Sequence, residues 1–291
     1  MKADFKGFCM QNYYHAQLQG PRDYQEDRIC VLELTLPSAA PDQNGCEQFL
    51  HQVIGSLHQS TFALNEDHCG STCTIALLLP DNRFFIGWLG DSPALLLSPH
   101  GCDLLTREHI PGCDPVFQVT ADNCEDVQGF QRVRSLHPVG EEEGDPIYQK
   151  LAVSRALGDN DFPLIRTPDV MRGNLTPGNM LAIASDGINT IMNYDGHFKS
   201  DAGINLDYAG DNPAEYLADR AHLNRPYKKG DNISVITLPF AADRSSILLA
   251  AVFDGHGGDR VADFAAQQLR VIVQPLWQKI FFGKTFILPE Y

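Results

Sequence analysis

A run of seven apolar residues near the end of the chain, Ile247 to Phe253, limits most strongly how this sequence can fold. The run is too short to span a bilayer and has the length of a buried strand. It ends in the segment Asp254 to Gly258, which reads DGHGG, and apolar residues then recur at helical spacing from Arg260 to Leu269. The sequence therefore predicts a buried strand that turns through an acid and several glycines into an amphipathic helix.

This corner suits a metal ligand, because an acid followed by glycines presents a hard oxygen where backbone and solvent can approach closely. Further acids lie at the edges of other apolar runs: Glu26, Asp27, Asp91, Asp186 and Asp231. Each of them alone is typical of a turn or a helix cap. Converging acids would repel one another unless divalent cations neutralised them, and all-oxygen coordination favours Mg²⁺ or Mn²⁺ over zinc.

Length and charge narrow the classes of partner. The chain has 291 residues with 43% hydrophobic content, which predicts one compact domain over residues 1–291. A formal net charge of -15 argues against nucleic acid and anionic membranes, and no apolar stretch has membrane-spanning length. The eight cysteines form no C-x-x-C pair. We therefore expect reduced thiols and a cytoplasmic location, in its own cell or in a host cell.

Short β-rich runs separated by Gly, Pro, Asp and Asn dominate the pattern, with few helices, which favours an α+β fold with helices packed outside antiparallel sheets. The expected strands are 28–34, 72–79, 84–89, 94–97, 180–184, 233–238 and 247–253. The expected helices are 46–62, 213–222 with a cap at 211–212, and 259–274, which stops before Pro275. Residues 108–150 have weak periodicity and are expected to pass over the surface beside the site.

Several motifs together resemble one family, the metal-dependent (PPM, 2C-type) protein Ser/Thr phosphatases. The matching segments are Arg22 to Arg28, Gly70 to Thr72, Gly90 to Ser92, Leu151 to Asp159, Ala184 to Gly187, Gly230 to Asn232 and Val252 to Gly258. The resemblance implies a four-layer α-β-β-α sandwich, in which helices flank two antiparallel sheets and a binuclear metal site lies at one end.

The resemblance also implies a ligand set. Asp27 and Asp254 would bridge two Mg²⁺ or Mn²⁺ ions, with the Gly255 carbonyl on one ion and Asp186 and Asp231 on the other. Glu26 would act through a metal-bound water, and Asp91 would join Asp186 in holding a third, weaker ion. A hydroxide bridging the two ions would attack the phosphorus of phosphoserine or phosphothreonine in a protein substrate.

Two further residues carry catalytic roles by the same resemblance. Arg22 would bind phosphate, since its planar guanidinium can pair with two oxygens, although a surface salt bridge is the alternative. His256 would act as the general acid that protonates the leaving alkoxide. No chemistry demands Asp159, Arg155 or Ser71, for which we expect structural roles such as pinning a loop.

The order of the motifs departs from the family pattern, in which the DGHGG strand and its helix follow the strand after Asp27 directly. Here residues 36–45 lead straight to the next helix, and the DGHGG unit appears after Asp231. The connector, Pro239 to Ser246, can reach at most roughly 28 Å. We expect the transposed unit to dock in cis in a monomer, and a swapped dimer that completes a neighbour's site is the alternative.

The sequence thus predicts a Mg²⁺- or Mn²⁺-dependent phosphatase that acts on phosphoserine and phosphothreonine. One alternative is a pseudophosphatase, a binding module of the same shape with an incomplete metal site. The other is a hydrolase of the same chemistry that acts on small phosphoesters. Phosphate release from phosphopeptides, compared with nucleotides and para-nitrophenyl phosphate, distinguishes these alternatives.

Overall fold

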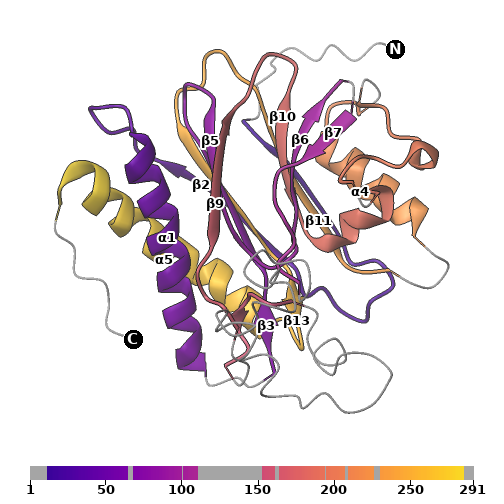
Figure 1. Cartoon of the computed structure of the whole chain (residues 1–291), viewed down its shortest axis with the longest axis horizontal. Coiled ribbons are helices and arrows are strands. Elements are labelled where there is room, and N and C mark those ends of the chain that lie inside the picture. The colour runs from indigo at the N-terminus through magenta and orange to yellow at the C-terminus, as the bar shows by residue number, and fades with distance from the viewer. Residues whose placement is uncertain are drawn as a thin grey trace, which may run out of the picture.

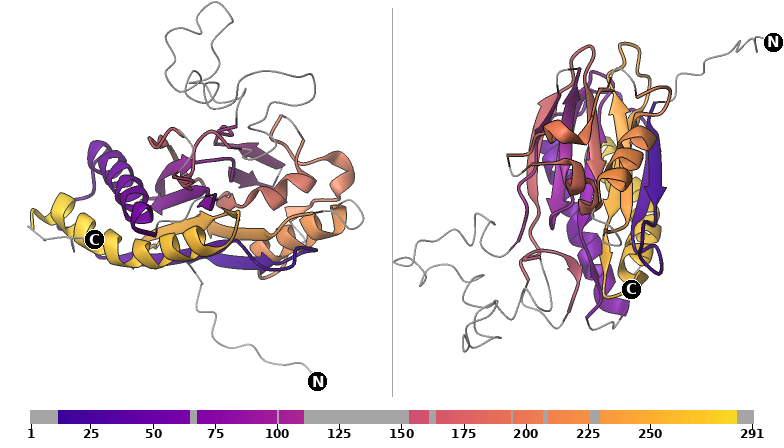
Figure 2. Two further views of the ribbon diagram at one scale, coloured as in Figure 1. Left: turned by 90° about the horizontal axis from the view of Figure 1, so that it is seen from below. Right: turned by 90° about the vertical axis from the view of Figure 1, so that its right-hand side faces the viewer.

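Two antiparallel sheets packed face to face, with helices on both outer faces, form the body of the molecule (Figures 1 and 2). This arrangement is seen in a computed structural model, which describes residues 12–64, 68–99, 101–110, 153–160, 164–193, 195–206, 209–225 and 230–284. The predicted α+β sandwich is confirmed. Of the expected surface excursion 108–150, the part from residue 111 onward lies outside the described residues.

The first sheet has five strands. Their spatial order is β1 (Tyr14–Leu18), β11 (Ile233–Pro239), β10 (Met180–Ala184), β6 (Ala94–Ser98) and β7 (Gly101–Leu104). Its outer face is covered by α4 (Pro213–Asn224) together with the 3-10 helices η3 (Asp186–Ile191) and η4 (Ser200–Ala202). The Asn212 side chain caps α4 by accepting a hydrogen bond from the Glu215 N–H, within the cap predicted from the sequence.

The second sheet also has five strands. Their order is β2 (Arg28–Leu34), β12 (Ile247–Phe253), β4 (Cys73–Leu78), β5 (Arg83–Leu89) and β9 (Asp169–Asn174). Two long helices, α1 (Gln43–Thr61) and α5 (Arg260–Phe282), cover its outer face, and the 3-10 helix η1 (Phe62–Leu64) follows α1. A small third sheet joins β13 (Gly255–His256), β3 (Gly70–Ser71) and β8 (Leu157–Gly158).

Strand β12 is buried along its whole length, because core residues pack against both faces of the sheet that contains it. Leu248, Ala250 and Val252 pack between the two sheets, whereas Leu249 and Ala251 pack with α1 and α5. Because side chains alternate between the faces of a strand, burial on both faces requires a continuous apolar run. The sequence of β12 has this pattern, so the strand was recognisable from the sequence.

Strand β12 is hydrogen-bonded between β2 and β4 of the same chain, antiparallel to both. The preceding connector is held in place: Asn82 and Ala241 exchange two hydrogen bonds of 2.8 and 3.1 Å, and buried Arg244 donates to the Pro239 carbonyl at 2.6 Å. A strand synthesised late thus lies beside two synthesised early. That relatives carry this strand earlier in their sequences remains a prediction.

The last helix corrects one expectation. Helix α5 passes through Pro275 and ends at Phe282, whereas the sequence predicted an end before the proline. An internal proline costs about 3 kcal/mol. Leu276 and Trp277, directly after it, are buried, and the Trp277 indole N–H donates to the Thr35 carbonyl at 2.8 Å. Removing a buried tryptophan costs about 3–5 kcal/mol, so packing offsets the broken helix hydrogen bond.

The remaining elements differ from the predictions mainly at their ends. Helix α1 begins at Gln43 rather than at residue 46, since Asp42 caps it by accepting from the Gly45 N–H at 2.7 Å. The expected strand 72–79 is observed as β4, which spans Cys73–Leu78, and the short β3, which Thr72 separates from it, was not predicted. Strands β1, β7, β8, β9 and β13 were not predicted, because they are short or carry polar residues.

None of the helices in the described part of the chain combines the length and apolar character needed to cross a bilayer. No disulfide joins the cysteines that the structure describes, all of them buried: Cys30, Cys46, Cys69, Cys73 and Cys102. For these five residues the expectation of thiols agrees with the structure. Cys9, Cys113 and Cys124 lie outside the described residues.

Candidate active site

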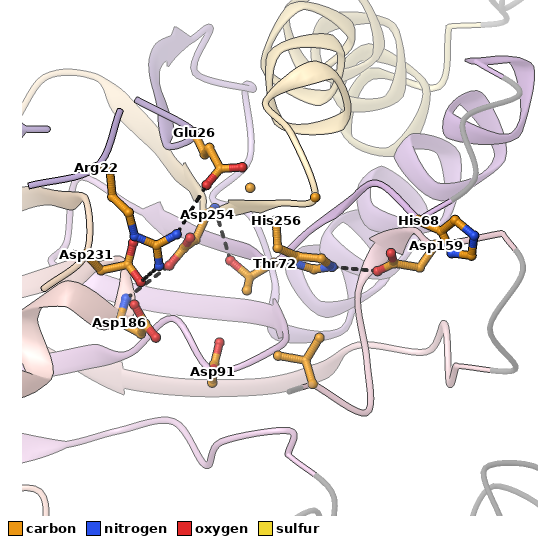
Figure 3. A pocket seen from close by; sticks show the side chains of 13 residues that line it. Arg22, Glu26, His68, Thr72, Asp91, Asp159, Asp186, Asp231, Asp254 and His256 are labelled. Carbon is orange, nitrogen blue, oxygen red and sulfur yellow. Dashed lines mark hydrogen bonds and ion pairs between the residues drawn. The ribbon is translucent and has the colours of Figure 1, made fainter. Parts of the chain in front are cut away.

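The predicted acids gather at one end of the sandwich. Asp27 and Asp231 precede β2 and β11, whereas Asp91, Asp186 and Asp254 follow β5, β10 and β12. Because the strands are antiparallel, these starts and ends meet at the same edge. A cavity of about 530 Å³ opens there (Figure 3), and its lining includes Arg22, Glu26, Asp91, Asp186, Asp231, Asp254, Gly255 and His256.

Asp254 is fixed by backbone and side-chain contacts on both sides. Its N–H donates to the Thr72 hydroxyl at 3.1 Å, and the Thr72 N–H donates to its carbonyl at 2.9 Å. One carboxylate oxygen accepts from the Asp186 N–H at 3.3 Å. The carboxylate that follows β12 is therefore held next to the first residue of η3, just after β10.

Asp27 lies outside the lining of the cavity and is only 1% exposed. Neither of its carboxylate oxygens has a hydrogen-bond partner. Burial raises the pKa of this carboxyl, and the nearby hydroxyls of Ser185 and Ser234 offset the effect only in part. A buried carboxylate whose neighbouring hydroxyls do not reach hydrogen-bonding geometry is costly, so its oxygens are suited to a cation that supplies the missing interaction.

The other acids share this electrostatic environment. Burial raises the pKa of Asp186 to about 8 and that of Asp91 to about 6, and it raises the pKa of Asp254 well above the ordinary value. Like charges add to the shifts: Asp91 is the first neighbour to act on Asp186, and Asp186 the first to act on Asp254. Such mutual repulsion favours either protons or divalent cations at this edge.

The acids are near one another but not drawn into a coordination shell. Within the described ranges, no three His, Cys, Asp or Glu side chains form a group that could hold a metal ion as they stand. The donor set itself is all oxygen and strongly acidic, which fits Mg²⁺ or Mn²⁺.

Glu26 is held between the start of β11 and the glycines after β13. One carboxylate oxygen accepts from the Gly258 N–H at 2.9 Å, and the Glu26 N–H donates to the Asn232 side-chain oxygen at 2.8 Å. Buried Asn232 also donates to the carbonyls of Gln19 and Tyr24, at 2.7 and 3.2 Å. Asn232 thus attaches the segment that carries Arg22 and Glu26 to strand β11.

Arg22 makes ion pairs with two candidate ligands. Its guanidinium contacts the carboxylate of Asp231 and lies 3.6 Å from that of Glu26. Its side chain remains 46% exposed at the mouth of the cavity. The salt-bridge alternative is therefore present in the structure, and phosphate binding by Arg22 remains a prediction.

His256 lies between the acids and Asp159 (Figure 3). Its Nε2 atom is 2.6 Å from the Asp159 carboxylate. The charge of His256 also lowers the pKa of Asp91, although burial of Asp91 and the charge of Glu108 outweigh this effect. One edge of the imidazole therefore contacts a buried acid, and the ring is near enough to the predicted metal edge to act on its charges.

The loop that carries Asp91 is supported from behind by His109. The Gly90 N–H donates to His109 Nδ1 at 3.2 Å, and the His109 N–H donates to the Gly90 carbonyl at 3.0 Å. His109 Nε2 lies 3.1 Å from Asp169, which also accepts from Arg155 at 2.9 Å. The structural role expected for Arg155 agrees with this contact.

Several residues that shape the site could not be recognised from the sequence. Asn232 and Thr72 lie inside motifs that were recognised, but their contacts join segments far apart in the chain and leave no periodic signal. Glu108 was not connected with Asp91, although its charge is the second-largest cause of the raised Asp91 pKa. An acid at the end of an apolar run was detectable, whereas a polar partner reached only through folding was not.

Comparison with known proteins agrees with this geometry. Residues 31–197 match the family described as Protein phosphatase 2C. The Xenopus laevis protein named Protein phosphatase 1K, mitochondrial is 29% identical over 181 residues, which are 60% of this chain and 44% of that protein. The match thus spans less than half the length of this relative.

Solved structures share the fold. The S. agalactiae serine/threonine phosphatase superposes with a TM-score of 0.54 at 16% identity, covering 79% of this chain and 99% of that one. Serine-threonine phosphatase 2C from Toxoplasma gondii gives 0.51 at 18% identity, covering 77% and 93%. With a family match over more than half of its length, the chain belongs to the protein phosphatase 2C family.

Proposed function

We propose that this protein is a divalent-cation-dependent phosphatase that hydrolyses phosphoserine and phosphothreonine in proteins. The observation that carries the proposal is the buried, partnerless carboxylate of Asp27 at the edge where the other strand-end acids meet. A cation on this carboxylate would offset the cost of burying it, which favours a metal-binding enzyme over a pseudophosphatase with an incomplete metal site. The family and the names of its structural neighbours support a phosphoprotein as the substrate.

Six side chains and one carbonyl would hold the cations: Asp27, Asp91, Asp186, Asp231, Asp254, Glu26 through a water, and the carbonyl of Gly255. When bound, a pair of divalent ions would activate a water for attack on phosphorus and neutralise charge on the phosphoryl oxygens. Asp27 and Asp254 would bridge the two ions. Asp91 would not bind this pair of ions, but would hold a third, weaker ion together with Asp186. Two hydrogen bonds between Asp254 and Thr72, one donated by each residue, hold Asp254 in place for this task, and one donated by the Gly258 N–H holds Glu26.

Arg22 would bind the phosphoryl group of the substrate. Its present partner, Asp231, belongs to the proposed ligand set, so a cation on Asp231 would compete with the guanidinium. The exposed position of Arg22 at the cavity allows the side chain to turn toward an incoming phosphate. Its planar fork can then pair with two phosphoryl oxygens.

His256 would donate a proton to the serine or threonine oxygen as the P–O bond breaks. Its ring lines the cavity and can contact a substrate bound there. An imidazole is suited to this task because it exchanges protons near neutral pH. A general acid of this kind contributes on the order of 10²–10⁴-fold to the rate.

Phosphate release tests the proposal directly. With Mn²⁺ or Mg²⁺ the protein is expected to release phosphate from a phosphoserine peptide, and EDTA should abolish the release. Asp254→Asn should lower kcat on the order of 10²-fold or more, because it removes charge from the bridging position. Asp103→Asn is the matched control. It replaces an exposed acid in β7, outside the cavity, and should leave the rate unchanged.

The same assay decides between the alternatives. Tight binding of the phosphopeptide without phosphate release, in the presence of Mn²⁺, would identify a pseudophosphatase. A kcat/KM for nucleotides well above that for phosphopeptides would identify a small-phosphoester hydrolase. Either result would contradict the proposal.

A further inference from the structure

We infer that Asp159 is a positioning residue for proton transfer by His256, an inference that rests on the function proposed above. The Asp159 carboxylate lies 2.6 Å from His256 Nε2, and the residue is only 1% exposed (Figure 3). This role goes beyond the loop pinning that the sequence predicted. It makes the two residues a functional pair within the active site.

The contact determines how the imidazole carries its protons. An ionised carboxylate can only accept hydrogen bonds, so in this contact Nε2 would carry the hydrogen and donate it to Asp159. The other ring nitrogen, Nδ1, is then the atom that can give a proton to the leaving oxygen of the substrate. The carboxylate also offsets the positive charge on the ring before that proton leaves.

The small third sheet brings the two residues together. Its register places His256 opposite Gly70 and Gly70 opposite Gly158, which directly precedes Asp159. The hydrogen bond therefore passes over Gly70. A Cβ atom at this glycine would lie 2.0 Å from the Asp159 carboxylate and 2.4 Å from His256 Nε2. Any side chain at position 70 would separate the pair.

Asp159 is held in an unusual backbone conformation. Its φ of 45° lies in the left-handed region, which residues other than glycine rarely adopt. Its N–H donates to the Cys69 carbonyl at 2.9 Å, and its own carbonyl accepts from the Arg166 guanidinium at 2.9 Å. Such conformations persist where surrounding contacts enforce them, and they concentrate at functional sites. Here the conformation directs the carboxylate at His256.

The chemical step balances without another reactant. A bond forms between phosphorus and the oxygen of water, and the ester P–O bond breaks. The proton on Nδ1 moves to the serine or threonine oxygen, which leaves as an alcohol, and His256 becomes neutral with Nε2 still bonded to Asp159. Water loses a proton to solvent, and solvent later restores the proton on Nδ1.

The inference is tested by changing the leaving group. A serine alkoxide needs a proton to depart, whereas para-nitrophenolate is stable without one. Asp159→Asn should therefore lower kcat for a phosphoserine peptide about tenfold or more, and kcat for para-nitrophenyl phosphate less than about threefold, with KM nearly unchanged. His256→Gln should give the same selectivity, and the double variant should lose little more than His256→Gln alone.

A matched variant separates positioning from general damage. Asp169→Asn removes another acid that contacts a histidine, His109, at 3.1 Å, but it does not touch His256. Any loss of activity in this variant should be equal for the two substrates. Gly70→Ala, if folded by circular dichroism, should reproduce the selectivity of Asp159→Asn.

A measurement on the metal-free protein does not depend on turnover. With ¹⁵N-labelled histidine, long-range ¹H–¹⁵N correlation should show His256, assigned through His256→Gln, protonated on Nε2 and hydrogen-bonded. In Asp159→Asn that Nε2–H resonance should shift upfield or be lost. An unchanged ring signal, or equal losses on both substrates, would overturn the inference. If the wild type hydrolysed neither substrate, the proposed function would fail, and the spectrum would still decide whether the pair exists.

Discussion

At the scale of single residues, the end of the sandwich where the acids gather combines burial with unsatisfied charge. Asp27 is buried without a hydrogen-bond donor, and the pKa values of Asp91, Asp186 and Asp254 are raised mainly by burial. A carboxyl whose folded pKa lies above its unfolded value binds more protons in the folded state. The stability of the metal-free protein should therefore fall as pH rises from about 4 to about 8, the window set by an unfolded carboxyl and by Asp186.

Replacing Asp27 tests this account of stability. Asp27→Asn removes a buried charge, so the metal-free variant should be more stable than wild type at pH 8, by about 1–3 kcal/mol, with a smaller gain at pH 5. The same variant should lose the stabilisation that Mn²⁺ gives the wild type. Urea unfolding at both pH values, with and without Mn²⁺, measures these effects. A variant less stable than wild type at pH 8 without metal would contradict this account.

The ligand acids could be predicted from the sequence because each lies at the end of an apolar run. Their partners could not. The contact between Asp159 and His256 depends on the register of three two-residue strands and on the absence of a side chain at Gly70. Asn232 likewise contacts Glu26 from 206 positions away. Such contacts follow from the fold and have no local pattern.

At the scale of elements, the strands with continuous apolar runs were predicted to within a residue or two, whereas edge strand β9 and the end of helix α5 were not. Strand β9, with the sequence DVMRGN, has no apolar periodicity and is defined by its pairing with β5. Proline is a local signal to end a helix. Tertiary packing around Trp277 overrides that signal in α5.

The last turns of α5 should therefore depend on this packing. Trp277 is fully buried, and its ring lies 5.0 Å from that of Phe49 in α1 and 4.1 Å from that of Phe281. Trp277→Ala should destabilise the protein by about 3–5 kcal/mol and should unwind the helix after Pro275. Chemical denaturation gives the first value, and amide hydrogen exchange over residues 276–282 tests the second. Unchanged exchange there would show that α5 continues without the tryptophan.

At the scale of the whole molecule, one end of the sandwich depends on segments from opposite ends of the chain. Strand β12 lies between β2 and β4, so Asp254 and Asp27 meet at the same edge although 227 positions separate them in sequence. The short connector after β11 is fixed by Asn82 and Arg244. Docking in cis therefore predicts an active monomer, with each site built from one polypeptide.

A crystal structure of the protein with Mn²⁺, with the ions located by anomalous scattering, tests the central claim most directly. The account predicts a manganese peak bound by the carboxylates of Asp27 and Asp254 of one polypeptide, with a second peak close to it near Asp186 and Asp231. Protein without manganese at this edge would contradict the claim. So would a site in which Asp254 comes from a neighbouring chain.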